Sequence, residues 1–412
     1  MPGKRDESIM IYFCEECGEQ ISPPPTTGNA KQVVLTCGGC NDSVIVPLNN
    51  TAGLRQSTPV MTNAPDSRLK VLVVDDSKFI RRVIREIINT DGSLQVVGEA
   101  ENGAHALELI PQLDPDVITL DINMPVMDGL TTLKHIMVRF PRPTVMFSSL
   151  TKEGASTSFD ALKYGAVDFL EKPSQMRDED QENQQASIID KIKMAAGVRL
   201  GSIRLIRRQN PQKGKASVSA ESIDTIYAIG AAEGGYASLL QFLPQLKPGS
   251  RAAYVVVLYA TAAHLHAFTD YLNNLCSIEV RRAEHGGSIR AGACYITAGN
   301  EYVTLEPNEN SITLSVTPSP FPERRGAINM LMVSLSEMTQ VAKTGVILAG
   351  DGDDGVEGLL EIEKTGGTAF IQNPETCLFK NMAMLAHQRC AAATVASPSE
   401  MATAFNHAPD NT

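Results

Sequence analysis

The stretch Val71-Leu-Val-Val-Asp-Asp76 is an apolar run followed by two carboxylates. Four further apolar runs follow it along the chain. The segment Phe79 to Asn89, directly after the first run, has isoleucine and valine at helical spacing. Runs that are apolar on both faces and alternate with helices predict a parallel, doubly wound α/β sheet. The further strands are predicted at Val96 to Val97, Val117 to Leu120, Thr144 to Phe147, and Phe169 to Leu170.

Length and composition limit the class of protein. At 412 residues the chain is expected to form two or three domains. A content of 43% hydrophobic and 20% charged residues is typical of a soluble globular protein, and a net charge of -11 argues against a surface for nucleic acid. The sequence has no apolar run of about 18 residues and no secretory signal. We therefore expect a cytoplasmic protein without membrane insertion.

Two cysteine pairs near the start of the chain predict a metal site. Cys14-Glu-Glu-Cys17 and Cys37-Gly-Gly-Cys40 are separated by nineteen residues. Four thiolates in two such pairs match the tetrahedral coordination of structural Zn²⁺, so residues 11–49 are predicted to form a zinc ribbon. Its expected role is to stabilise a small fold, with protein docking as the alternative. The remaining cysteines, which lie in apolar surroundings, are predicted to be core residues: Cys276, Cys294, Cys377 and Cys390.

Polar residues follow the predicted strands at their carboxyl ends, where open α/β sheets place ligands. Asp75 and Asp76 follow the first strand, Asp121 the third, Ser148 the fourth, and Lys172 the fifth. Converging carboxylates repel one another unless a cation lies between them, and an all-oxygen ligand set suits Mg²⁺. The sequence therefore predicts a magnesium site.

This order of residues resembles that of the two-component receiver domains. The resemblance implies that Asp121 is the phosphoacceptor, and that Ser148 and Lys172 bind the phosphoryl oxygens. It also implies that Mg²⁺ is held by Asp75, Asp76, Asp121 and the main-chain carbonyl of Asn123. Phe169 would occupy the aromatic switch position of the family.

A second resemblance begins at Ile229-Gly-Ala-Ala-Glu-Gly-Gly235, which is similar to the Ile-Gly-Ala-Ser-Thr-Gly-Gly segment of the chemotaxis protein-glutamate methylesterases. In that family a serine, a histidine and an aspartate form the catalytic triad. Here Ala232 stands at the serine position, Tyr259 at the histidine position with Ala260 as the other candidate, and Asp354 at the aspartate position. We therefore expect a domain that keeps the fold and lacks hydrolysis.

Neighbouring residues support this expectation. Glu233 and Asp351 add carboxylates where an anionic intermediate would need hydrogen-bond donors. Ser238 and Cys276 are alternative nucleophiles by sequence, but Ser238 is expected on a helix and Cys276 has no base placed beside it. His264 and His266 are expected on the following helix as ordinary histidines.

The predicted organisation is a flavodoxin-like receiver and a second, Rossmann-like α/β domain of the methylesterase type, preceded by the zinc ribbon. Helices are expected over Gln185 to Val198 and Ala327 to Val341, and a strand-rich insert over Ile278 to Thr317. The expected bounds are residues 11–49 for the ribbon, 50–68 for a linker, 69–198 for the receiver, 199–222 for a second linker, and 223–406 for the methylesterase-like domain.

These observations predict a response regulator of the chemotaxis type that is phosphorylated on Asp121 and whose inactive output domain binds a partner. The expected partners are a histidine kinase of the chemotaxis type and a chemoreceptor or other signalling protein. One alternative is an active protein-glutamate methylesterase and protein-glutamine deamidase acting on methyl-accepting chemoreceptors. Another is a phosphate sink that only drains phosphoryl groups from a histidine kinase.

Overall fold

The computed structural model describes residues 12–13, 20–21, 32–36, 43–47, 68–148, 152–173, 178–198, 222–308, 311–320 and 326–407. Within the first 50 residues it has two antiparallel strand pairs. β1 (Tyr12–Phe13) pairs with β2 (Gln20–Ile21), and β3 (Gln32–Thr36) pairs with β4 (Ser43–Pro47). The four cysteines of the predicted zinc ribbon lie outside the described residues, and the zinc site stays a prediction.

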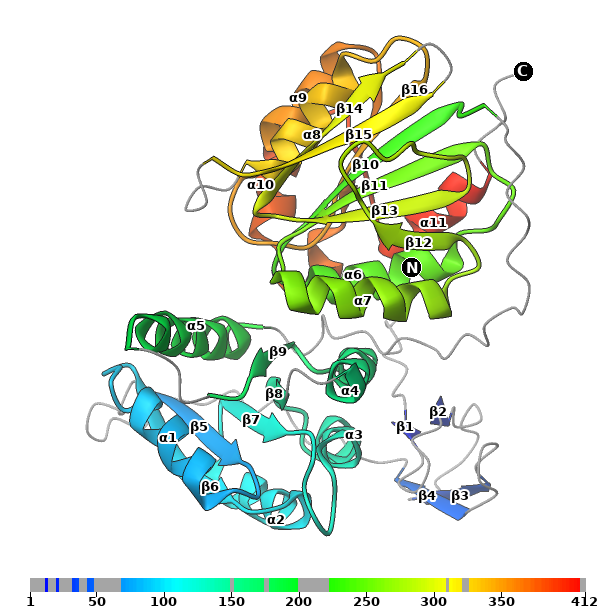
Figure 1. Cartoon of the computed structure of the whole chain (residues 1–412). Coiled ribbons are helices and arrows are strands. Elements are labelled where there is room, and N and C mark those ends of the chain that lie inside the picture. Colours follow the sequence, from blue (N-terminus) through cyan, green and yellow to red (C-terminus); the bar gives the residue numbers. More distant parts are fainter. Residues whose placement is uncertain are drawn as a thin grey trace, which may run out of the picture. The chain divides into compact units, whose positions relative to one another are not determined.

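A five-stranded sheet has the order β6-β5-β7-β8-β9 (Figure 1). Its β5–β6, β5–β7 and β8–β9 pairs are parallel. The strands are β5 (Leu69–Val74), β6 (Leu94–Ala100), β7 (Val117–Asp121), β8 (Thr144–Ser148) and β9 (Asp168–Glu171). The helices are α1 (Lys78–Ile88), α2 (Gly103–Leu113), α3 (Gly129–Arg139), α4 (Lys152–Lys163) and α5 (Asp178–Ala196). The predicted doubly wound sheet is confirmed, because every predicted apolar run forms a strand and all but the half-buried edge strand β6 are largely buried.

A seven-stranded parallel sheet follows, with the order β12-β13-β11-β10-β16-β17-β18. Its strands are β10 (Thr225–Ala231), β11 (Ala252–Leu258), β12 (Glu279–Arg282), β13 (Ala293–Ala298), β16 (Ala342–Ile347), β17 (Thr368–Gln372) and β18 (Thr394–Ala396). The hairpin of β14 (Glu301–Pro307) and β15 (Ile312–Pro318) forms a separate antiparallel pair.

Helices cover both faces of this sheet (Figure 1). One face packs against α8 (Ala327–Ser336), α9 (Val356–Lys364) and α10 (Asn381–Arg389), which share a core with it. The other face meets α6 (Gly235–Phe242), α7 (Ala262–Leu275) and α11 (Pro398–Asn406). A tilted contact between the Tyr227 ring and that of Phe405, with centroids 4.2 Å apart, joins β10 to α11. The second α/β domain predicted from the sequence is thus confirmed as a fold.

Three predicted details were wrong. The segment Ile278 to Thr317 is only partly an insert, because β12 and β13 extend the main sheet through the parallel pairing of β13 with β11. Helix α8 ends at Ser336, five residues before Val341, and β16 begins at once with Ala342. Helix α5 begins at Asp178, seven residues before the expected Gln185, in a polar segment that carries no apolar period.

The chain divides into two compact units. The first comprises residues 1–144 and 173–196, and the second comprises residues 145–172 and 197–412. Nearly all of β8, together with α4 and β9, therefore groups with the seven-stranded sheet, whereas β5, β6, β7 and α1 belong to the first unit. The predicted domain bounds stay predictions. In the part of the chain that the structure describes, no helix is long and apolar enough to cross a membrane.

Candidate functional sites

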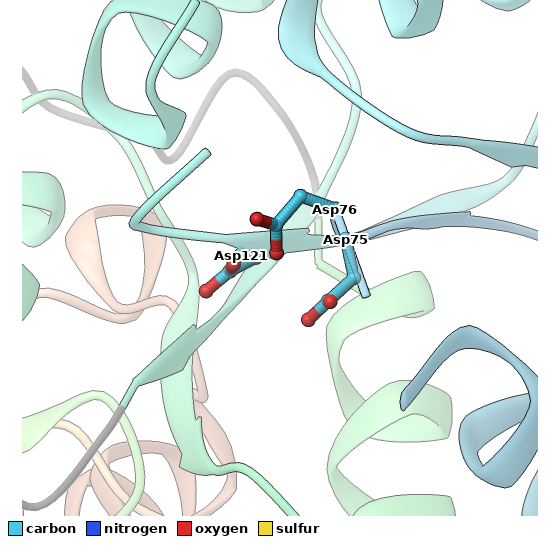
Figure 2. Close-up of side chains that lie close together, drawn as sticks. All are labelled: Asp75, Asp76 and Asp121. Atoms are coloured by element: carbon cyan, nitrogen blue, oxygen red, sulfur yellow. The ribbon is translucent and has the colours of Figure 1, made fainter. Parts of the chain in front are cut away.

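Three carboxylates meet at the carboxyl ends of β5 and β7. Oxygen atoms of Asp75, Asp76 and Asp121 lie within 4.8 Å of one another, as Figure 2 illustrates. Asp75 and Asp121 are buried, with 0% and 1% of their surface exposed, whereas Asp76 is exposed. Like charges so close in a partly desolvated place oppose one another, which favours a cation among them.

The backbone around this cluster is tightly constrained. The Asp75 N–H donates to the Ala100 carbonyl at 3.1 Å, and the Ser77 N–H donates to Asp75 Oδ1 at 2.8 Å, which orients that carboxylate. Gly129 opens α3 against the end of β7, and a Cβ atom there would lie only 2.0 Å from the Asp121 carbonyl oxygen. Only glycine permits this approach, so the helix start is fixed beside the carboxylates.

The donor set fits Mg²⁺. This ion prefers oxygen ligands and keeps several waters, and the cluster offers three carboxylates of which Asp76 faces solvent. When bound there, Mg²⁺ would supply positive charge to phosphoryl oxygens near Asp121. The magnesium site itself stays a prediction.

The other residues expected at the receiver site lie at or just after the carboxyl ends of strands. Asn123 is exposed two residues after β7, in the first unit. Ser148 ends β8 and is buried, and Lys172 follows β9 with its N–H donating to the Ser148 carbonyl at 3.1 Å. Both lie in the second unit, and their action on Asp121 stays a prediction.

Phe169 belongs to an aromatic cluster inside the second unit. Its ring lies 5.1 Å from the ring of Tyr236 on α6 and 4.9 Å from that of His264 on α7. Phe159 of α4 contacts the same group, with its ring 4.9 Å from that of Phe268 and 5.9 Å from that of Tyr236. The predicted switch residue is therefore buried against the helix that begins three residues after Ala232.

Ala232 lies in the turn between β10 and α6. Its N–H donates to the Ala349 carbonyl at 2.9 Å, and its carbonyl accepts from the Gly235 N–H at 2.8 Å. Gly234 adopts φ 75°, a left-handed conformation that brings the chain sharply into the helix. The residue is 2% exposed, so the position presents a buried methyl group where a triad needs a nucleophile.

Tyr259 and Asp354 are in direct contact. The Tyr259 hydroxyl donates to Asp354 Oδ2 at 2.7 Å and accepts from the Gly326 N–H at 3.1 Å. A Cβ atom on Gly299 would lie 2.2 Å from the Tyr259 ring, so this glycine leaves the room that the ring occupies. Of the two candidates for the histidine position, it is Tyr259 whose side chain reaches the carboxylate.

Asp354 also holds the start of α8. Its Oδ2 accepts from the Ile328 N–H at 2.9 Å, and its Oδ1 accepts from the Asn329 N–H at 3.0 Å. These are first-turn amides that have no partner within a helix, and a carboxylate there is also favoured by the helix dipole. The carboxylate, 2% exposed, thus serves as a structural anchor.

Burial, and next the nearby charge of Asp354, raise the pKa of the Tyr259 hydroxyl well above its ordinary value. A tyrosine is neutral at pH 7 at its ordinary pKa, the shift moves Tyr259 further from ionisation, and its hydroxyl donates a hydrogen bond to Asp354. A group in this state cannot accept a proton from a nucleophile, as the histidine of a triad does.

Of the two extra carboxylates beside Ala232, Glu233 contacts the backbone of Asp351, and Asp351 contacts a neighbouring side chain. Glu233 Oε2 accepts from the Asp351 N–H at 3.1 Å, and Asp351 Oδ1 accepts from the Asn381 amide at 2.6 Å. The Asp351 amide therefore already has an acceptor within the protein. Carboxylates in this segment would oppose a negatively charged intermediate nearby.

The alternative nucleophiles and bases lie in ordinary structural positions. Ser238 is buried on α6, where its hydroxyl approaches the Gly234 carbonyl at 3.4 Å. His264 and His266 lie on α7, as expected, and Cys276 is a buried free thiol at the end of that helix. The three other cysteines outside the ribbon are also buried and free, as the core interpretation predicted.

Two groups of functional importance were not anticipated from the sequence. The backbone amides of Gly326, Ile328 and Asn329 surround the Tyr259 and Asp354 pair, and an amide carries no side-chain signature. Arg81 contacts the backbone of the carboxylate cluster, although its place on α1 looks in the sequence like that of any surface arginine.

Known families match both folded regions. Residues 71–181 match the response regulator receiver domain, and residues 227–405 match the CheB methylesterase. The chain is similar to proteins named protein-glutamate methylesterase/protein-glutamine glutaminase. It is 38% identical to the one from Pyrococcus horikoshii over 76% of this chain and 86% of the relative, and 37% identical to the one from Halalkalibacterium halodurans over 79% and 93%. This chain therefore belongs to the CheB methylesterase family, as a chemotaxis-type response regulator with a receiver and a methylesterase domain.

Proposed function

We propose that Asp121 accepts a phosphoryl group from a histidine kinase, and that the methylesterase domain of this chain acts by binding a partner and does not hydrolyse esters. One observation carries the second half of the proposal. The Tyr259 hydroxyl donates to Asp354 at 2.7 Å beside an alanine at the nucleophile position.

Ester hydrolysis requires a nucleophile, a base and a carboxylate that orients the base. Ala232 offers no attacking atom, and Tyr259 is a phenol, which keeps its proton near neutral pH and has a pKa that is raised further here. Removal of a linked triad member costs on the order of a millionfold in rate, and further removals add little. The roles of nucleophile and base are thus both absent at Ala232 and Tyr259.

The carboxylate cluster supports the phosphoacceptor half of the proposal. Asp121 ends β7 beside Asp75 and Asp76, and these carboxylates suit a divalent cation. Phosphoryl transfer depends mainly on positioning and on neutralising the charge of the phosphoryl oxygens, which a cation at this place would do.

The aromatic cluster offers a route from the receiver to the output domain. Phe169 packs on Tyr236, and Tyr236 lies in the first turn of α6 close to Ala232. A change in Phe169 packing upon phosphorylation would alter α6 and the surface around it. A chemoreceptor or another signalling protein that binds there would sense the phosphorylation state.

The test is a pull-down with the full chain as bait, before and after treatment with acetyl phosphate and Mg²⁺. We expect partner recovery to change severalfold for the wild type and not for Asp121→Asn. Equal recovery under both conditions, together with a very short lifetime of the phosphorylated protein, would instead favour a phosphate sink.

A second candidate is an active protein-glutamate methylesterase and protein-glutamine glutaminase, and the names of the curated relatives favour it. Methanol release from methylated chemoreceptors decides between the two. We expect none above background from the wild type, and measurable release from the Ala232→Ser, Tyr259→His double variant. Release by the wild type that exceeds this background would reject the inactive output domain and leave the phosphoacceptor role intact.

A further inference from the structure

Arg81 reaches from α1 back to the segment that carries two of the clustered carboxylates. Its Nη1 donates to the Asp75 carbonyl at 2.7 Å and to the Asp76 carbonyl at 3.2 Å. These carbonyls lie between the end of β5 and the start of α1. A single planar guanidinium thus fixes two successive peptide groups.

Arg81 is itself held in place. Its Nε lies 3.4 Å from Glu99 Oε2, and Arg85 Nη1 lies 2.7 Å from Glu99 Oε1. Glu99 is on β6, in register with Val73 of β5. The Arg81 side chain is only 13% exposed, so this arrangement is largely shielded from water and salt.

We infer that Arg81 is a positioning residue for the divalent cation of the receiver, with Glu99 as its support. The peptide groups at Asp75 and Asp76 determine where the two carboxylates point. By holding both carbonyls, Arg81 keeps the carboxylates directed at Asp121 before any cation arrives. This inference rests on the proposed phosphoacceptor function, because it presupposes that the cluster binds Mg²⁺.

A purely electrostatic role of Arg81 predicts that its removal changes cation affinity in the opposite direction. The guanidinium is a positive charge near a cation site, so its removal would strengthen cation binding by Coulomb's law. A positioning role predicts weaker binding in spite of the lost repulsion. Groups that hold metal ligands in place typically affect metal affinity by about 10- to 100-fold.

The chain offers a matched control in Arg82. This neighbour on the same helix forms an ion pair with Glu86, and its side chain is 68% exposed. Arg82→Gln removes the same charge from the next residue of α1, whose partner is Glu86 and not the Asp75 or Asp76 backbone. Arg81→Lys retains the charge but loses the planar fork, so it separates geometry from charge.

The experiment is titration of the full chain with Mn²⁺ as a substitute for Mg²⁺, with free Mn²⁺ followed by electron paramagnetic resonance. Mg²⁺ competition and an Asp121→Asn reference identify binding at the carboxylate cluster. Thermal unfolding in EDTA, in the absence of any cation, checks that each variant folds.

We expect Arg81→Gln and Arg81→Lys to weaken binding at the cluster by about 10-fold or more, Glu99→Gln to weaken it less, and Arg82→Gln to change it by less than about twofold. Unchanged or tighter Mn²⁺ binding by Arg81→Gln would overturn the inference. Mn²⁺ affinity equal to that of the wild type in Arg81→Lys would overturn it too. If Arg81→Gln does not fold, Arg81→Lys and Glu99→Gln decide alone. A wild type that does not bind Mn²⁺ at the cluster would overturn the proposed phosphoacceptor function instead.

Discussion

At the end of β7 three carboxylates lie within 4.8 Å of one another, whereas near the start of α8 a single carboxylate, Asp354, accepts hydrogen bonds from Ile328, Asn329 and Tyr259. The first arrangement concentrates negative charge, and an external cation would stabilise it. In the second arrangement the single carboxylate is stabilised by hydrogen bonds from the protein itself. The comparison teaches that a retained acidic residue can belong either to a ligand site or to the framework of the fold.

The largest expected effect concerns the first of these two regions. Asp121→Asn should abolish incorporation of phosphate from radiolabelled acetyl phosphate, because an amide oxygen is a far poorer nucleophile than a carboxylate. Asp128→Asn is the matched control. Asp128 lies on the same loop and caps α3 through the Thr131 N–H at 2.8 Å, and asparagine caps a helix equally well. Equal labelling of wild type and Asp121→Asn would place the acceptor elsewhere.

The anchoring role of Asp354 predicts the next largest effect. Asp354→Ala leaves two amides and a phenol buried without their acceptor, which should cost about 3 kcal/mol in the free energy of unfolding. Hydrogen exchange should accelerate in peptides covering residues 326–336, and the urea midpoint of the second unit should fall. Asp353→Ala, at the exposed neighbouring position, should change stability by less than about 0.5 kcal/mol. Unaltered exchange in α8 would contradict the anchoring role.

The hydroxyl of Tyr259 should contribute less. Tyr259→Phe removes the hydrogen bond to the charged Asp354 and the one accepted from the Gly326 N–H, so a loss of about 2 kcal/mol is expected at pH 8. The pKa of this hydroxyl is raised in the folded state, so folding favours the protonated phenol. Its stabilising contribution is complete below the unfolded pKa of about 10 and declines as the pH rises beyond it. Urea unfolding of the wild type and of Tyr259→Phe at pH 8 and pH 11 measures this pH dependence of the stability difference. A stability difference that stays constant or widens at pH 11 would contradict the assignment.

The smallest effect concerns backbone strain. Val126 has φ 68° although it is β-branched, and the Met127 N–H donates across it to the Pro125 carbonyl at 2.7 Å. In the second unit every described residue with positive φ is a glycine. Val126→Asn should therefore stabilise the first unit by about 1 kcal/mol, because asparagine tolerates this conformation far better. Val126→Ala keeps most of the cost of a positive φ and should therefore not reach the stabilisation expected for Val126→Asn. Both are measured by thermal unfolding, and no gain for asparagine would argue against strain.

The sequence predicted the strands of the five-stranded sheet well, because each contains an apolar run followed by polar or turn residues. It could not assign β12 and β13, since a strand at the edge of a parallel sheet has the same local pattern as a strand of an inserted hairpin. The start of α5 was missed because that segment is polar, and polar helices have no apolar period to detect.

The candidate sites were predictable to different degrees. Asp75, Asp76 and Asp121 follow their strands directly, so strand topology alone brings them to one edge. The contact of Tyr259 with Asp354 joins residues 95 positions apart and depends on room left by Gly299 and on an amide of Gly326. Such contacts depend on tertiary packing, which no local pattern encodes. The contacts of Arg81 with two carbonyls are local in sequence, but they require the geometry of the turn into α1.

The contact of Asp354 with the first turn of α8 has a consequence for judging activity from sequence in this family. A side chain that anchors a helix is needed for folding whether or not any chemistry takes place beside it. An aspartate at this place is therefore a poor diagnostic of turnover in proteins with this architecture. The more informative positions are those expected for the nucleophile and the base, which in this chain hold Ala232 and Tyr259.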